Sequence, residues 1–244
     1  MTRRRWIADE VSGDRAFLLS ENADHLSRVL RARVGQQFEI ATPDGVRLGE
    51  IVEIQAGRVS FSIRELPETS RSEPLSARIH LYLAIFKFDR FEWAIEKCTE
   101  LGATSIVPTV TRRTDSHLVP AALKRVERWR RVAREAAQQS RRDAVPEIAN
   151  PTKLDKAVID ASGHRVVLAE TEAERPVREA VRGHNEMSLA VGPEGGWTDS
   201  EMALFRENGW IQASLGPTIL RAETAAIAAL AVARALTQDL PPVL

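Results

Sequence analysis

The chain has 244 residues, 43% of them hydrophobic and 28% charged, which suits a sizeable core and excludes the disordered and fibrous classes. Its 34 basic and 34 acidic side chains sum to a formal net charge of zero, so a uniformly basic coat for nucleic acid is excluded. The single cysteine, Cys98, excludes an intramolecular disulfide, and the histidines show no zinc-ligand spacing. We therefore expect a cytoplasmic protein without a metal site.

From residue 4 to about residue 63, short apolar runs alternate with turn residues, which is typical of a small β-barrel. The runs lie at 6–8, 17–19, 38–40, 46–54 and 59–63. Pro43, Asp44 and Gly45 predict a hairpin turn, and Ser20 or Asn22 is expected to cap a helix. The apolar face of this helix should consist of Leu26, Val29 and Leu30.

A linker is expected after the last of these runs. Residues 65–76 are rich in proline and serine and carry no apolar periodicity. We therefore predict two domains, a β-rich one at 1–72 and a second one at 73–244. Membrane association is not expected, because the most apolar stretch, residues 225–233, is far shorter than the roughly 20 residues that cross a bilayer.

Strands alternate with helices in the second domain. The strands are expected at 79–85, 104–108, 165–169, 188–191 and 210–214. One helix should be capped by Asp89, carry Cys98 on its apolar face and end at Gly102, and a long helix should follow Pro120. This alternation predicts an α/β domain with a parallel sheet covered by helices.

Three segments in this domain follow predicted strands and could bind a ligand. They are Leu168-Ala169-Glu170, Gly192-Pro193-Glu194-Gly195-Gly196 and the segment from Leu215 to Arg221. Ligands in open α/β sheets lie beyond the carboxyl ends of the strands, so the three segments could converge on one pocket. Neither a Rossmann nor a P-loop glycine motif occurs. The alternative is that the glycines form a tight turn before a helix that Thr198 and Glu201 cap.

The combination of these segments carries a family resemblance. Gly192-Pro193-Glu194-Gly195-Gly196-Trp197, followed by Leu215-Gly216-Pro217-Thr218-Ile219-Leu220-Arg221-Ala222-Glu223-Thr224-Ala225, strongly resembles the bacterial 16S rRNA uridine-N3 methyltransferases of the SPOUT superfamily. Residues 96–102, 135–141 and 25–31 resemble further segments of that family, so the likeness spans nearly all of the chain. Thr218 and Ala222 depart from the family pattern, which usually has Arg and Thr there.

The resemblance implies a fold, a cofactor and a substrate. The fold is an N-terminal PUA-like barrel and a C-terminal domain with a deep trefoil knot and cofactor site at about 165–236. The cofactor is S-adenosyl-L-methionine, and the reaction is methylation of N3 of uridine 1498 of 16S rRNA in the small ribosomal subunit by a homodimer. The expected cofactor-binding residues are Leu168, Ala169, Glu170, Gly192, Pro193, Glu194, Gly195, Gly196, Leu215, Gly216, Leu220 and Arg221.

Methylation at N3 predicts two catalytic roles. Because uridine N3 carries a proton, the site needs a proton acceptor or a cation that stabilises the developing negative charge. Arg221 is the candidate cation, with an ordinary ion pair to Glu223 or Glu194 as the alternative. Glu194 and Glu223 are the candidate proton acceptors, although each could simply be a helix N-terminal charge. The sequence does not choose between them.

Basic residues concentrate in one segment. Residues 112–142 hold ten basic side chains against three acidic ones, which predicts either a phosphate-binding surface or a solvated helix face. The candidate RNA-binding residues are Arg3, Arg4, Arg5, His25, Arg28, Arg31, Arg112, Arg113, Arg141 and Arg142. Two other functions stay open, namely a SPOUT methyltransferase for another RNA nucleotide, such as a tRNA ribose 2′-O, and a non-catalytic ribosome assembly factor.

Overall fold

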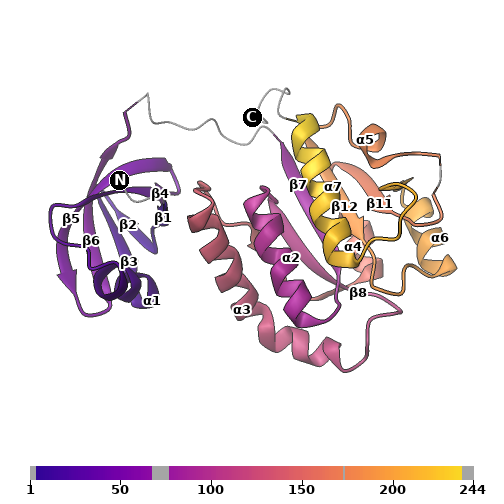
Figure 1. Ribbon diagram of the computed structural model, residues 1–244, viewed down its shortest axis with the longest axis horizontal. Helices are drawn as coiled ribbons and strands as arrows, with labels where there is room; N and C mark the ends of the chain where they lie inside the picture. Colours follow the sequence, from indigo (N-terminus) through magenta and orange to yellow (C-terminus); the bar gives the residue numbers. More distant parts are fainter. Residues whose placement is uncertain (1–3, 68–76, 173, 238–244) are drawn as a thin grey trace. The chain divides into compact units, whose positions relative to one another are not determined.

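The computed structural model describes residues 4–67, 77–172 and 174–237 (Figure 1). The chain divides into two compact units, and each is built on its own sheet. The first unit comprises Met1–Pro74 and Ala137–Val145, and the second comprises Leu75–Ala136 and Pro146–Leu244. The predicted domain boundary between residues 72 and 73 lies outside the described residues.

A curled, barrel-like sheet of six strands forms the first unit, in the order β1-β4-β5-β6-β3-β2. The strands are β1 (Trp6–Ile7), β2 (Glu10–Ser12), β3 (Arg15–Leu19), β4 (Gln37–Thr42), β5 (Gly45–Gln55) and β6 (Arg58–Glu65). Neighbours are antiparallel except β1 and β4. Thr42 pairs with Gly45, which confirms the predicted hairpin with Pro43 and Asp44 as its turn. The sequence missed β2, because that strand is exposed throughout and has no apolar alternation.

The expected helix of the first unit is present, but its N-cap residue and its buried face differ from the prediction. It consists of α1 (Ser20–Asp24) and a π-helical turn, η1 (His25–Val29). The cap prediction was wrong, because the N-cap residue is Leu19 and no side chain of the described residues caps the helix. Leu26 is buried as predicted, whereas Val29 is 66% exposed. The wider π-helical turn rotates the later residues away from the core, which a 3.6-residue period cannot anticipate.

Residues 137–145 are joined to the first unit through the side chain of Arg5, which is only 2% exposed. Arg5 Nε donates a hydrogen bond of 2.9 Å to Glu39 Oε2, and its Nη1 bonds to Asp143 and to the carbonyl of Arg141. Arg4 Nε donates to Gln138 Oε1 at 3.1 Å. Such long-range pairing of a buried cation is invisible in the sequence.

The second unit contains a seven-stranded sheet in which every pair is parallel, as predicted. The strand order is β10-β8-β7-β12-β11-β13, and β9 pairs with β8. The strands are β7 (Arg78–Ala84), β8 (Ser105–Val110), β9 (Glu147–Ile148), β10 (Thr152–Lys153), β11 (His164–Leu168), β12 (Glu186–Val191) and β13 (Ile211–Ala213). The five strands expected from the sequence are all present, whereas β9 and β10 are too short to show a pattern.

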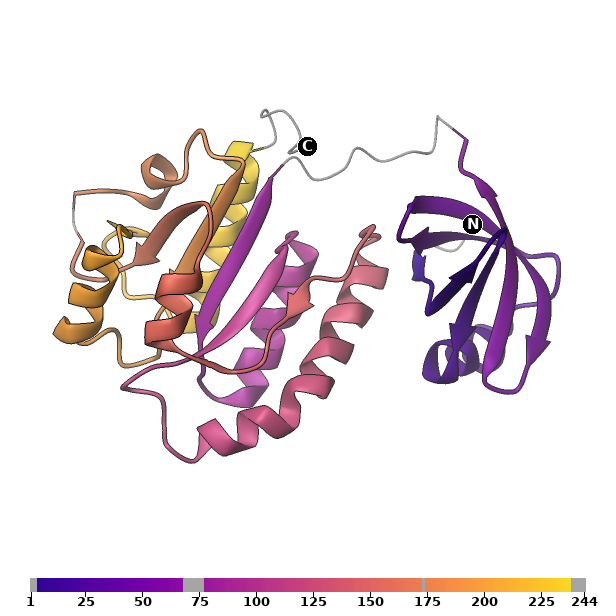
Figure 2. The same ribbon diagram turned by 180° about the vertical axis from the view of Figure 1, so that it is seen from behind.

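Helices cover both faces of this sheet. They are α2 (Phe88–Glu100), α3 (Leu118–Gln139), α4 (Leu154–Asp160), α5 (Val177–Ala180), α6 (Asp199–Glu207) and α7 (Ala222–Thr237). Helices α2 and α7 lie on one face, and Figure 2 shows α4 on the other, where it packs with α6 against β11 and β12. Among the described residues, no helix is long and apolar enough to span a membrane.

Two helices begin at residues other than those predicted from the sequence. Lys87, not Asp89, is the N-cap of α2, and Asp89 lies in its first turn. Helix α3 begins at Leu118, so Pro120 lies inside its first turn, where a missing N–H is harmless. Cys98 is fully buried in α2, which confirms its place in the core, and this burial raises the pKa of its thiol to about 12.

Arg234 fastens α7 to the start of β7 and the end of α2. Its Nη1 donates to the carbonyl of Ala77 at 2.9 Å and its Nη2 to the carbonyl of Gly102 at 2.6 Å, and burial lowers the pKa of the guanidinium. We expect Arg234→Met to lower the free energy of unfolding by about 2 kcal/mol, because both carbonyls lose a buried donor. Urea unfolding measures this, with exposed Arg178→Met as the control. An unchanged midpoint would show that these bonds contribute nothing.

Candidate active site

The candidate site lies where three neighbouring parallel strands of the second unit end. In the sheet β11 sits between β12 and β13, although it precedes both in the chain. The connections leaving β11 and β12 therefore run in opposite directions across the sheet. Such a change of direction opens a crevice at the carboxyl ends of the strands.

One cavity of about 550 Å³ occupies this crevice. The three predicted ligand-binding segments all line it, which confirms their convergence. The predicted residues on its wall are Leu168, Ala169, Glu170, Gly192, Pro193, Glu194, Gly195, Gly196, Leu215, Gly216, Leu220 and Arg221. Thr218 and Ala222, the two departures from the family pattern, also line it. Two arginines on its wall, Arg90 and Arg113, were not predicted for this pocket.

The loop at 192–196 is held by its own backbone and by a tryptophan. Gly196 donates a backbone hydrogen bond to Pro193, and Gly196 and Gly216 have φ of +73° and +113°, which favour glycine. Trp197 Nε1 donates to the carbonyl of Leu168 at 2.8 Å and so ties the loop after β12 to the end of β11. A Cβ on Gly192 would lie 3.1 Å from the Trp197 ring. A side chain at 192 would therefore push against this ring.

The capping box predicted for the next helix is also present. The Thr198 side chain accepts a hydrogen bond from the Glu201 backbone, and the Glu201 carboxylate accepts one from Thr198. The two interpretations of the glycine segment are thus compatible, because it is both a tight turn before a capped helix and a wall of the cavity. Glu201 Oε1 also accepts the backbone N–H of Arg112 at 2.8 Å.

Arg113 covers the glycine loop from the segment that follows β8. Its guanidinium donates to the carbonyl of Gly195, and a Cβ on Gly195 would lie 3.2 Å from Arg113 Cδ. Within the described part of the chain, this guanidinium has no carboxylate partner. A cation that was predicted for RNA binding therefore lies at the wall of the cavity.

Two of the three predicted catalytic side chains, Arg221 and Glu194, line the cavity. Arg221 is exposed, lines the cavity and, among the described residues, pairs with no carboxylate. The alternative ion pair to Glu194 or Glu223 is therefore not formed. Both carboxylates instead face Arg90, whose Nη1 lies 2.7 Å from Glu194 and whose Nε lies 3.8 Å from Glu223. The sequence missed Arg90 because it is 104 residues from Glu194.

Several predicted RNA-binding arginines have partners inside the protein. Arg3 lies outside the described residues. The burial of Arg5 contradicts its predicted contact with RNA, because its guanidinium is used inside the first unit. Arg141 pairs with Glu39, and Arg142 is half-buried. Arg4 lies 3.4 Å from the His25 ring nitrogen and stacks over Trp6, so both predicted residues are held in a local cluster.

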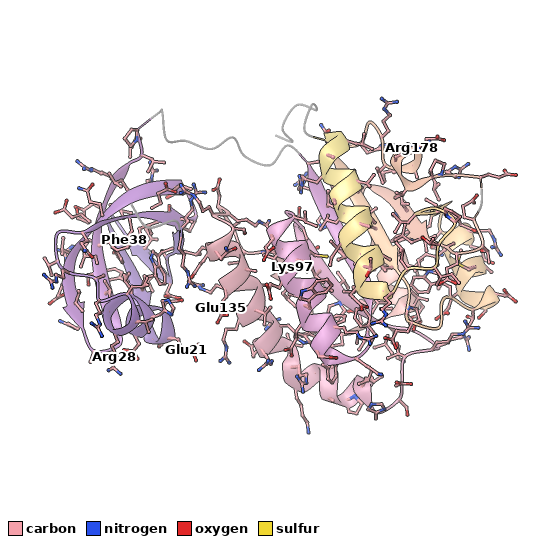
Figure 3. All side chains as sticks on the ribbon, in the orientation of Figure 1. Glu21, Arg28, Phe38, Lys97, Glu135 and Arg178 are labelled. Carbon is pink, nitrogen blue, oxygen red and sulfur yellow. The ribbon has the colours of Figure 1, made fainter. Side chains whose placement is uncertain are left out.

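The remaining candidates are exposed. Arg28 is 72% exposed and weakly paired with Asp24 at 3.4 Å (Figure 3). Arg31 and Arg112 are exposed, and their side chains have no hydrogen-bond or ion-pair partner among the described residues. Not every positive charge of residues 112–142 is free for a ligand, because Arg125 and Arg128 both form ion pairs with Glu92. Over the same described ranges, no group of three or more His, Cys, Asp or Glu is arranged to hold a metal ion.

Comparisons with known proteins agree on one family. A model described as an RNA methyltransferase domain matches residues 72–234. The ribosomal RNA small subunit methyltransferase E of Synechocystis is 36% identical over 229 residues, which cover 91% of this chain and 73% of the relative. The protein of that name from Mycobacterium bovis is 35% identical and covers 93% of this chain and 86% of the relative. The crystal structure of the ribosomal RNA small subunit methyltransferase E from Neisseria gonorrhoeae bound to S-adenosyl methionine is also similar, with a TM-score of 0.83 and 26% sequence identity. The match covers 96% of this chain and 97% of the Neisseria chain.

Proposed function

Because this chain belongs to the bacterial family of ribosomal RNA small subunit methyltransferases E, we propose that it transfers a methyl group from S-adenosylmethionine to N3 of uridine 1498 in 16S rRNA. The observation that carries the proposal is the cavity beyond β12, β11 and β13, whose wall combines glycine loops with an arginine that has no carboxylate partner among the described residues.

The residues around the cavity fit S-adenosylmethionine. Its volume is in the range of small-molecule sites, and the glycines leave backbone N–H and C=O groups uncovered for the edge of an adenine ring. Leu168, Leu215 and Leu220 offer apolar surface. When bound, the cofactor supplies a methyl group on a positively charged sulfur. We assign its binding to the predicted residues that line the cavity.

Two side chains of the cavity can prepare the uracil. Its N3 is a poor nucleophile until it loses a proton, so a carboxylate within reach is needed. Glu194 lines the cavity and is 42% exposed, whereas the side chain of Glu223 is 7% exposed. We therefore assign Glu194 as the carboxylate that accepts the N3 proton of the uracil. Arg221 stabilises the negative charge that develops on the uracil oxygens, because no carboxylate among the described residues neutralises its guanidinium.

RNA binding is assigned to exposed arginines of both units. Arg28 and Arg31 follow α1, and Arg112 and Arg113 lie in the segment after β8. These side chains are accessible, which binding of RNA phosphates requires. His25 and Arg4 support the same surface of the first unit from the cluster on Trp6.

Replacing two of these arginines predicts a change in salt dependence. We expect Arg31→Gln and Arg112→Gln each to weaken binding of small-subunit rRNA severalfold and to reduce the slope of log K against log salt by about 1, because each removes one phosphate contact. Filter binding at several salt concentrations measures both values. Arg178→Gln, a substitution at another exposed arginine (Figure 3), is the control. Parallel salt plots for variant and wild type would remove these residues from the RNA surface.

Finer features of the family are part of the proposal. We expect a PUA-like first domain, a trefoil knot within residues 165–236, a cytoplasmic enzyme that uses no metal, and a homodimer whose second copy completes the site.

The direct test is methyl transfer from labelled S-adenosylmethionine to small ribosomal subunits that lack this modification, followed by nucleoside analysis. N3-methyluridine is the expected product. Label on another nucleoside would move the target to a different RNA position. Calorimetric binding of the cofactor without any label would favour a ribosome assembly factor.

A further inference from the structure

Arg90 lies between two carboxylates from distant parts of the chain. It belongs to the first turn of α2, Glu194 to the loop after β12, and Glu223 to the first turn of α7. Arg90 Nη1 donates to Glu194 Oε1 at 2.7 Å, and Arg90 Nε lies 3.8 Å from Glu223 Oε1. One guanidinium therefore connects the loop to two helices.

The two carboxylates differ in exposure. Glu223 is buried, and within the described ranges its Oε2 has no hydrogen-bond partner. A buried carboxylate needs a nearby cation, and Arg90 is the cation that faces it. Glu223 is absent from the wall of the cavity, which Arg90 and Glu194 both line. Glu223 is thus suited to hold Arg90 and poorly placed to reach a substrate.

Only one oxygen of Glu194 is used by Arg90. In the part of the chain that the structure describes, Glu194 Oε2 has no partner, and this carboxylate lines the cavity. The N3–H group of a uracil is a hydrogen-bond donor, and a carboxylate oxygen with free lone pairs is its natural acceptor. Pairing through Oε1 restricts the rotation of the side chain and so fixes where Oε2 lies.

We propose that Arg90 is a positioning residue, anchored by Glu223, that holds Glu194 so that its free oxygen accepts the N3 proton of the uridine. The inference rests on the proposed function, because it takes uracil N3 as the reacting atom. It also assigns different tasks to the two carboxylates, which the sequence could not separate.

The backbone of the loop has anchors other than Arg90. Gly196 bonds to Pro193, Trp197 to Leu168, and Gly195 to Arg113. Loss of Arg90 should therefore release the Glu194 side chain and leave the backbone wall of the cavity in place. This separates a fall in kcat from a loss of cofactor binding.

The first test compares Arg90→Gln, Glu194→Gln and the double variant. We expect Glu194→Gln to lower kcat about 100-fold and Arg90→Gln about 30-fold, with the Kd of S-adenosylmethionine by calorimetry changed less than about threefold. The double variant should be no slower than Glu194→Gln alone, because Arg90 acts through Glu194. Arg90→Lys should recover part of kcat. Arg78→Gln, which breaks the Arg78–Glu186 pair elsewhere in the second unit, is the matched control with unchanged kcat.

Three results would overturn the assignment. They are an unchanged kcat in Arg90→Gln, losses that multiply in the double variant, and an increase in the cofactor Kd as large as the fall in kcat. The last would make Arg90 a cofactor contact.

A second test uses unfolding of the protein without substrate. Arg90→Gln should lower Tm by several degrees, since Glu223 loses its cation, and adding Glu223→Gln should restore part of that loss. Additive changes in Tm would refute the anchor. If the wild-type chain makes no N3-methyluridine, the proposed function has failed, whereas the Tm comparison still decides whether Glu223 anchors Arg90.

Discussion

Replacing Arg221 with alanine is expected to lower kcat about 100- to 1,000-fold while the Kd of S-adenosylmethionine changes less than about threefold. The guanidinium lines the cavity and, over the described residues, no carboxylate neutralises it, so its full charge is available to the substrate. Uracil gains negative charge on its oxygens only as N3 loses its proton, so the interaction strengthens toward the transition state. Single-turnover methylation and calorimetry measure the two quantities separately.

The appropriate comparison for this variant is Arg221→Lys, which keeps the charge but lacks the planar fork of donors. We expect it to recover part of the loss. Arg178→Ala, at an exposed position of helix α5, controls for a general loss of positive charge. A change confined to the cofactor Kd would show that Arg221 contacts the ligand and has no role in the chemical step.

Gly192→Val is expected to weaken S-adenosylmethionine binding about 5- to 140-fold, because overpacking of this kind typically costs about 1–3 kcal/mol and here acts on the binding site itself. A Cβ at 192 would lie 3.1 Å from the Trp197 ring and 3.2 Å from its Nε1, which donates to the Leu168 carbonyl. Displacing the ring breaks the link between two walls of the cavity. Calorimetric titration measures the Kd, and cooperative thermal unfolding confirms that the variant folds.

Gly195→Ala is the matched comparison for Gly192→Val. Its Cβ would meet the flexible side chain of Arg113 and no backbone, so we expect a smaller loss of affinity than for Gly192→Val. Equal losses at both positions would indicate that any side chain in the loop blocks the ligand. An unchanged Kd in Gly192→Val would contradict the cavity as the cofactor site.

Features that depend on neighbouring residues were predictable from the sequence. The hairpin at Pro43 and Asp44 and the capping box of Thr198 and Glu201 each depend on residues within a few positions of one another. Five strands of the parallel sheet were also found, because buried strands are continuous apolar runs. Short or exposed strands such as β2 and β9 lack that pattern and were missed.

The sequence predicts which backbone segments form the site, but not how its charged side chains pair. Glycine segments after strands identify the walls of the cavity, because the sheet brings the ends of neighbouring strands together. The partners of charged side chains were not predictable, since Arg90 and Glu194 are 104 residues apart and Arg5 and Asp143 are 138 apart. Burial, which separates Glu223 from Glu194, is likewise a property of the folded chain.

The pairing of Arg5 with Asp143 has a consequence for the order of events during synthesis. The first unit is discontinuous, because residues 137–145 belong to it together with the first 74. As the chain leaves the ribosome, the barrel-like sheet emerges complete while its buried guanidinium still lacks Asp143 and the Arg141 carbonyl. Glu39 can pair with this guanidinium at once, but more than sixty further residues must be added before its bonds to Asp143 and to the Arg141 carbonyl can form. Its final stability is therefore gained only after part of the second unit has been synthesised.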